Sequence, residues 1–142
     1  WTSTLIYKIV IVTQGPEYYE TAVQGSVNTT PPSLTTFQLV LAVVVMYVFV
    51  GFSEEYCFRG VLLKEFSRKN RIVGILASSG IFMIYHVFPG VVPWTTFLTF
   101  WPYYLLFGVI LSIITIINKG DLLMAIIAHG TFNSILFVLR YA

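Results

Sequence analysis

Apolar residues dominate the chain after about residue 36, and only short polar connections interrupt them. Each long apolar run approaches the roughly 20 residues that an α-helix needs to cross a bilayer. The pattern therefore predicts an all-α fold, a polytopic transmembrane helical bundle. The expected spans are Phe37 to about Leu63, Ile72 to Phe88, about Trp94 to Ile117, and Leu122 to Arg140.

The residues ahead of these runs have a different character, so we divide the chain into residues 1–33 and 34–142. The segment from Trp1 to Val12 is apolar but short. It is interpreted either as the end of a membrane span or as an interfacial segment. The stretch from Thr13 to Ser33 is polar and closes with two prolines, which favours an exposed loop on the outer side.

The composition supports a membrane location for the core. The chain is 57% hydrophobic and 10% charged, and its mean hydropathy is +0.84. A soluble domain of 142 residues could not bury that much apolar surface in one core. The net charge of +2 and the lack of a basic stripe argue against a nucleic-acid partner. We therefore expect an integral membrane protein whose surface contacts lipid.

The cations predict an orientation. Lys64, Arg68, Lys69 and Arg71 crowd the connection between the first two expected spans. We expect a protein of the cell membrane, and the positive-inside rule then places the Lys64 to Arg71 loop on its cytoplasmic side. The connection from Pro89 to Pro93 then lies on the outer face.

An acidic pair, Glu54 and Glu55, interrupts the first apolar run, and Arg59 lies one helical turn beyond Glu55. Ionisable groups at membrane depth cost roughly 2.5 to 3.5 kcal/mol each on insertion scales, so they are rarely retained without a partner or a task. Residues four apart on a helix are neighbours, so Glu55 and Arg59 are predicted to form an ion pair. Glu54 points about 100° away and remains free for other work.

Other polar residues fall at a similar depth on later spans. With a rise of about 1.5 Å per residue, Glu54 lies roughly 15 Å from the cytoplasmic end of its helix and His86 roughly 22 Å. By the same estimate His129 and Asn133 lie roughly 12 and 18 Å from theirs. Lipid would leave such groups unsatisfied if they faced outward. The residues are therefore predicted to converge on a buried polar site.

The residue types at this site suggest hydrolysis of an acyl bond. Desolvation favours the neutral form of a carboxyl group, which suits Glu54 to accept a proton as a general base. His86 is placed to hydrogen-bond the same water. His129 and Asn133 share a helix face, and both can donate hydrogen bonds to one oxyanion.

Three motifs carry a resemblance to a known family. Glu54 to Arg59 reads EExxxR, Phe82 to His86 reads FxxxH, and His129 to Asn133 reads HxxxN. In this order on successive helices they resemble the CPBP family, also called Abi. That family groups CAAX prenyl endopeptidases with bacteriocin-processing and immunity-associated membrane proteins. The similarity covers roughly Phe37 to Tyr141.

The resemblance implies a glutamate intramembrane peptidase without a metal or another cofactor, acting on a membrane-associated or prenylated substrate. Glu54 and His86 would activate water, and His129 and Asn133 would form the oxyanion hole. Glu55 and Arg59 would support the site. Members of the family have more spans than this chain is expected to have, so the flanking helices that help admit substrate would be either missing or supplied by a partner, such as another membrane subunit.

Three alternatives stay open. Two glutamates and two histidines are suitable zinc ligands, although no HExxH motif is present and asparagine is a poor ligand for zinc. A catalytically inactive scaffold or accessory subunit of a membrane complex could keep the same motifs. A proton-coupled transporter would also use buried carboxylates and histidines, but the chain lacks internal repeats.

Overall fold

The computed structural model describes residues 15–17 and 34–141, with side chains as far as residue 139 in the last helix. Within these ranges all regular secondary structure is helical, which confirms the predicted all-α class. The predicted apolar segment from Trp1 to Val12 lies outside the described residues. So does most of the predicted loop from Thr13 to Ser33.

The first predicted span is one long helix, Thr36–Phe66. Its winding changes along its length, because one π-helical stretch precedes a short α-helical segment and a second follows it. The pieces are α3 (Thr36–Val45), η1 (Met46–Gly51), α4 (Phe52–Glu55), η2 (Tyr56–Leu63) and α5 (Lys64–Phe66). Glu54 and Glu55 therefore lie between two π-helical turns, a rare winding that is frequent at functional sites.

Three further helices follow: α6 (Arg71–His86), α7 (Trp94–Ile117) and α8 (Leu123–Tyr141). Side-chain caps define where two of the helices begin. Thr35 and Gln38 form a capping box at α3, and the Asn70 side chain accepts hydrogen bonds from two backbone N–H groups of α6.

The four predicted spans are thus confirmed as helices with nearly the predicted bounds. Thr36–Phe66 and Trp94–Ile117 are long and apolar enough to cross a membrane, whereas α6 and the apolar part of α8 are shorter.

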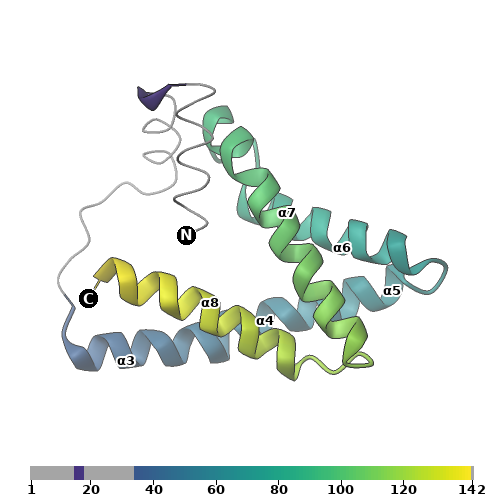
Figure 1. Cartoon of the computed structure of the whole chain (residues 1–142), viewed down its shortest axis with the longest axis horizontal. Helices are drawn as coiled ribbons and strands as arrows, with labels where there is room; N and C mark the ends of the chain where they lie inside the picture. The colour runs from purple at the N-terminus through teal and green to yellow at the C-terminus, as the bar shows by residue number, and fades with distance from the viewer. Residues whose placement is uncertain (1–14, 18–33, 142) are drawn as a thin grey trace.

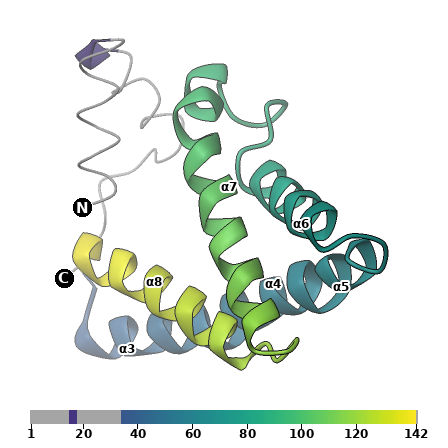
Figure 2. The same cartoon turned by 45° about the vertical axis from the view of Figure 1, so that its right-hand side comes forward.

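The long first helix forms one side of the bundle, and the other helices pack along it (Figure 1). Helix α8 lies beside α3, η1 and α4, while α6 lies beside η2 and α5. Helix α7 runs obliquely across the bundle and packs mainly on α6, as the turned view in Figure 2 also shows. Helix α4 packs directly on α8, and His86 at the end of α6 lies 3.5 Å from Glu54, so the glutamates lie where these helices meet.

Small residues allow the close helix contacts. A Cβ atom at Gly108 of α7 would lie 3.0 Å from the Ser79 Cβ and 3.1 Å from the Ser79 Cα of α6. The Ser78 hydroxyl donates a 2.7 Å hydrogen bond to the Phe58 carbonyl. Gly74 and Ser78, small residues one turn apart on α6, are both buried and serve this helix contact.

The outer surface of the bundle is apolar. No residue of α3 is buried, and large side chains such as Phe37 (75% exposed) and Leu139 (79% exposed) cover the outside. Fully buried positions in the described part are instead often polar, including Glu55 and Arg59. This inverted distribution suits a hydrocarbon environment, where polar groups must be satisfied inside the protein.

Candidate active site

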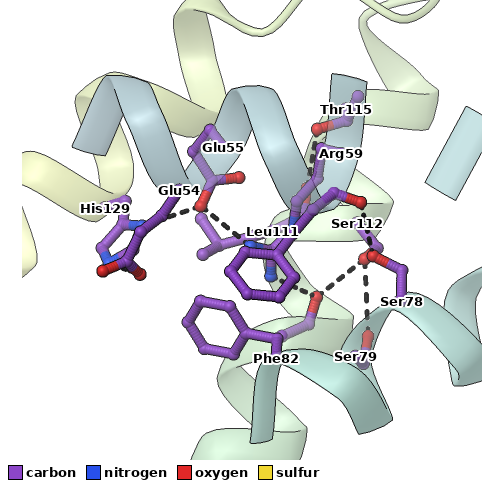
Figure 3. Close-up of polar contacts among 12 residues, drawn as sticks. Glu54, Glu55, Arg59, Ser78, Ser79, Phe82, Leu111, Ser112, Thr115 and His129 are labelled. Carbon is purple, nitrogen blue, oxygen red and sulfur yellow. Dashed lines mark hydrogen bonds and ion pairs between the residues drawn. The ribbon is translucent and has the colours of Figure 1, made fainter. Parts of the chain in front are cut away.

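Side chains from α4, η2, α6 and α8 meet at the centre of the bundle, and Figure 3 shows how most of them lie. Glu54 and Glu55 come from α4, Arg59 from η2, His86 from the last position of α6, and His129 from α8. These are five of the six residues that the sequence predicts for the site. The helices therefore bring together residues up to 75 positions apart, since Glu54 contacts His129.

Glu54 faces both histidines. Its Oε2 atom lies 3.5 Å from His86 Nε2 and 3.8 Å from His129 Nε2. These separations are too long for good direct hydrogen bonds, and Oε2 has no hydrogen-bond partner within the described part of the chain. The side chains of Glu54 and His86 are 15% and 21% exposed. This pair is thus the accessible part of the cluster.

His86 is held in one orientation by its neighbours. Its Nδ1 lies 2.9 Å from the Phe82 carbonyl oxygen, which can only accept, so Nδ1 carries a hydrogen. In the neutral imidazole the lone pair is then on Nε2, the atom that faces Glu54. The ring of Tyr104 stacks on the imidazole, with the centroids 4.7 Å apart.

Glu55 is the acceptor for two partners. Its Oε1 atom lies 2.9 Å from an Arg59 guanidinium nitrogen, which confirms the predicted ion pair. The same oxygen lies 2.7 Å from His129 Nδ1, a contact that the sequence did not predict. The side chains of Glu55 and Arg59 are completely buried, and that of His129 is 2% exposed. These three residues form the sealed part of the cluster.

Glu54 and Glu55 were expected to point in different directions and to have separate partners, but both carboxylates lie beside the same histidine. One imidazole, His129, presents Nδ1 to Glu55 and Nε2 to Glu54. Adjacent residues on a helix point in different directions, but a ring with two nitrogens can lie between them. His129 therefore links the sealed and the accessible parts of the cluster.

Arg59 is anchored to a third helix as well. A second guanidinium nitrogen donates a 3.1 Å hydrogen bond to the Gly108 carbonyl of α7. Its guanidinium carbon lies 4.4 Å from the centroid of the Phe82 ring, which is fully buried. Such a position over an aromatic face is favourable for a cation. Phe82 thus packs against the buried arginine.

Helix α7 supplies residues that the sequence analysis missed. Tyr104 stacks on His86, the Phe107 ring centroid lies 5.3 Å from that of His129, and Gly108 binds Arg59. A signal was present in the spacing, since residues three and four apart on a helix share a face. That face also includes the buried Leu111.

Asn133 lies one turn beyond His129 on α8 and is half-buried. It makes no hydrogen bond within the described ranges, so its role as an oxyanion donor stays a prediction.

The described residues do not provide the set of ligands that the zinc alternative would need. Among the described residues there is no group of three or more His, Cys, Asp and Glu side chains that could hold a metal ion.

Comparison with known families gives one match. Residues 36–135 match the family model described as type II CAAX prenyl endopeptidase Rce1-like. The matched region runs from α3 into α8 and includes all six residues predicted for the site. No curated protein and no solved structure matches the chain.

Proposed function

Because the chain belongs to the Rce1-like family of type II CAAX prenyl endopeptidases, we propose that it is an intramembrane endopeptidase in which Glu54 activates water. The proposed substrate is a membrane-associated peptide, including one that carries a prenyl group. The observation that carries the proposal is the accessible pair of Glu54 and His86, whose Oε2 and Nε2 atoms face each other at 3.5 Å. The family is a membrane-embedded protease family, so the activity proposed is of the family's general kind.

The pair suits a water that donates both of its hydrogens. An ionised Glu54 and the Nε2 lone pair of a neutral His86 are both acceptors, so neither satisfies the other. A water hydrogen-bonded to both would turn its own lone pairs outward, toward a carbonyl carbon. General base catalysis by a positioned carboxylate typically contributes about 10² to 10⁴ in rate.

The sealed residues supply a charge balance. With both carboxylates ionised, Arg59 and a protonated His129 make the cluster neutral, which limits the cost of burying it. In that state His129 donates Nδ1–H to Glu55 and retains Nε2–H for a developing oxyanion. Asn133 is proposed as the second donor, from the next turn of α8.

The proposed reaction is an ordinary amide hydrolysis. The water oxygen bonds to the scissile carbonyl carbon, and Glu54 takes the water proton. The oxyanion accepts hydrogen bonds from His129 and Asn133. The C–N bond then breaks, and the proton held by Glu54 passes to the leaving amine. We propose that this takes place in the half of the bilayer near the Lys64 to Arg71 loop, on the cytoplasmic side.

The test uses the full chain in lipid nanodiscs with a peptide ending in a prenylated CAAX sequence and the same peptide without the prenyl group. Mass spectrometry would detect release of a carboxyl-terminal fragment. Cleavage of either peptide, absent in the Glu54→Gln variant, supports the proposal. If neither is cleaved while the chain co-purifies with other membrane subunits, the scaffold interpretation replaces it.

A further inference from the structure

A second polar feature lies on the side of Arg59 away from His129. It is a cavity of about 570 Å³ between η2, α5 and the ends of α6 and α7. Figure 3 shows Thr115, one of the lining residues, beside Arg59 on that side of the cluster. The lining consists of Arg59, Gly60, Leu63, Lys64, Ser67, Arg71, Thr115, Ile116, Lys119 and Gly120.

The charge around this cavity has one sign. Lys64, Arg71 and Lys119 line it from three different segments, and no carboxylate lines it. None of these three cations forms an ion pair within the described part of the chain. In contrast, the neighbouring Arg68, which does not line the cavity, is paired with Glu65 at 2.9 Å. Three uncompensated cations around a cavity of ligand size predict an anion as the occupant.

Two buried donors in the same lining have no partner. The Nε atom of Arg59 and the hydroxyl of Ser67 are buried without a hydrogen bond within the described ranges. The Arg59 side chain is 0% exposed. Neither atom is reached from the cavity, however, and the Ser67 hydroxyl lies against Gly74 of α6, so the case for an anion rests on the three cations that line the cavity.

The turn after α7 places one cation with an unusual backbone. Lys119 has a φ of 57° and follows the helix C-cap, where glycine is the usual residue. Gly120 comes only next, with a φ of 91°. A lysine at a left-handed position is uncommon, so conformational preference does not account for it. Lys119 is also one of the residues that line the cavity.

We propose that this cavity binds the phosphate group of an anionic lipid. The lipid source is favoured because the apolar Leu63 and Ile116 line the cavity together with the cations, which suits an amphipathic ligand. Lys64 and Arg71 also belong to the loop that the positive-inside rule places at the cytoplasmic headgroup level. Basic pockets between membrane helices on that side are a general means of holding lipid headgroups.

The binding test uses the full chain in an uncharged detergent. A fluorescent phosphatidic acid is titrated onto it, with the matching phosphatidylcholine as a reference and inorganic phosphate as a competitor. Arg71→Gln combined with Lys119→Gln should weaken phosphatidic acid binding about thirtyfold, since each cation near a lipid phosphate contributes roughly a fivefold factor.

The matched control is Arg68→Gln combined with Lys69→Gln, which removes the same amount of charge from the loop that contains Arg71, at two positions outside the cavity lining. It should change the affinity less than twofold. If both double variants lost the same affinity for phosphatidic acid, general surface charge would explain the binding and the proposed site would be wrong.

Two readouts on the unaltered chain do not depend on how the variants fold. Phosphatidic acid should bind at least tenfold more tightly than phosphatidylcholine, and added salt should weaken it. Equal binding of the two lipids would overturn the proposal. The proposal would also be overturned if inorganic phosphate displaced phosphatidic acid at concentrations similar to that of the lipid. The cavity would then be a site for a soluble anion.

Discussion

The two parts of the central cluster have similar residue types but different surroundings. Glu54 and His86 retain some exposure and stand 3.5 Å apart without a good hydrogen bond. Glu55, Arg59 and His129 are sealed and joined by contacts of 2.7 and 2.9 Å. The Oε2 atoms of both glutamates lack a hydrogen-bond partner in the described part of the chain, so Glu54 differs from Glu55 in the partial exposure of its side chain and in its position beside His86. This contrast favours Glu54 over Glu55 for the proposed chemistry.

Among the substitutions that test this contrast, Glu54→Gln is expected to have the largest effect. The amide keeps the size of the side chain but cannot accept a proton, so the hydrolysis rate should fall by about 10² to 10⁴ while thermal unfolding is unchanged. Glu65→Gln is the matched control, because Glu65 is an exposed glutamate on the same long helix. Unchanged cleavage by Glu54→Gln would remove the accessible part of the cluster from the chemistry.

The sealed part is tested by Arg59→Ala, which leaves Glu55 buried with one partner fewer. Removing one member of a buried ion pair typically lowers the free energy of unfolding by about 3 to 5 kcal/mol. Thermal unfolding in detergent would measure this loss. Arg68→Ala is the control, because its pair with Glu65 is 70% and 57% exposed and should contribute less than about 1 kcal/mol. Equal losses would mean that burial does not distinguish the two pairs.

Asn133→Ala tests whether α8 contributes to catalysis beyond His129. Loss of one oxyanion donor should reduce kcat by about 10² to 10³, roughly 3 to 4 kcal/mol, with little change in KM. Chelators should have no effect on the unaltered chain. The zinc interpretation reverses this order: chelation abolishes activity, added zinc restores it, and Asn133→Ala is mild.

The smallest expected effect concerns the ring beside His86. Tyr104→Leu removes the stack on the imidazole, and aromatic pairs contribute about 0.5 to 1.5 kcal/mol beyond their burial. We expect kcat to fall about two- to tenfold. Tyr104→Phe keeps the ring and should leave kcat unchanged. A loss with Tyr104→Phe as great as that with Glu54→Gln would instead assign the hydroxyl a part in the chemistry.

Local pattern was enough to predict the helices. The long first helix runs over Thr36–Phe66 where the apolar run predicted Phe37 to Leu63, because apolar length and the polar turns on either side set those bounds. The ion pair of Glu55 with Arg59 was also predictable, since it depends only on helical spacing.

Contacts between helices were harder to predict. The hydrogen bond between Glu55 and His129 joins residues 74 positions apart, and the stack of Tyr104 on His86 depends on how α7 lies against α6. The π-helical stretches on either side of α4 also alter how side chains are aligned. These features follow from packing, which hydropathy along the chain does not encode.

The contact between Gly108 and Ser79 limits how this chain can vary over evolution. The acceptor for Arg59 on α7 is a backbone carbonyl, so no substitution can delete it. Any side chain at position 108 would instead press on the Ser79 backbone, because its Cβ would lie 3.1 Å from that Cα. Ser79 or the α7 backbone would then have to give by a few tenths of an ångström. A side chain at position 108 therefore acts on the helix contact that holds this carbonyl beside Arg59.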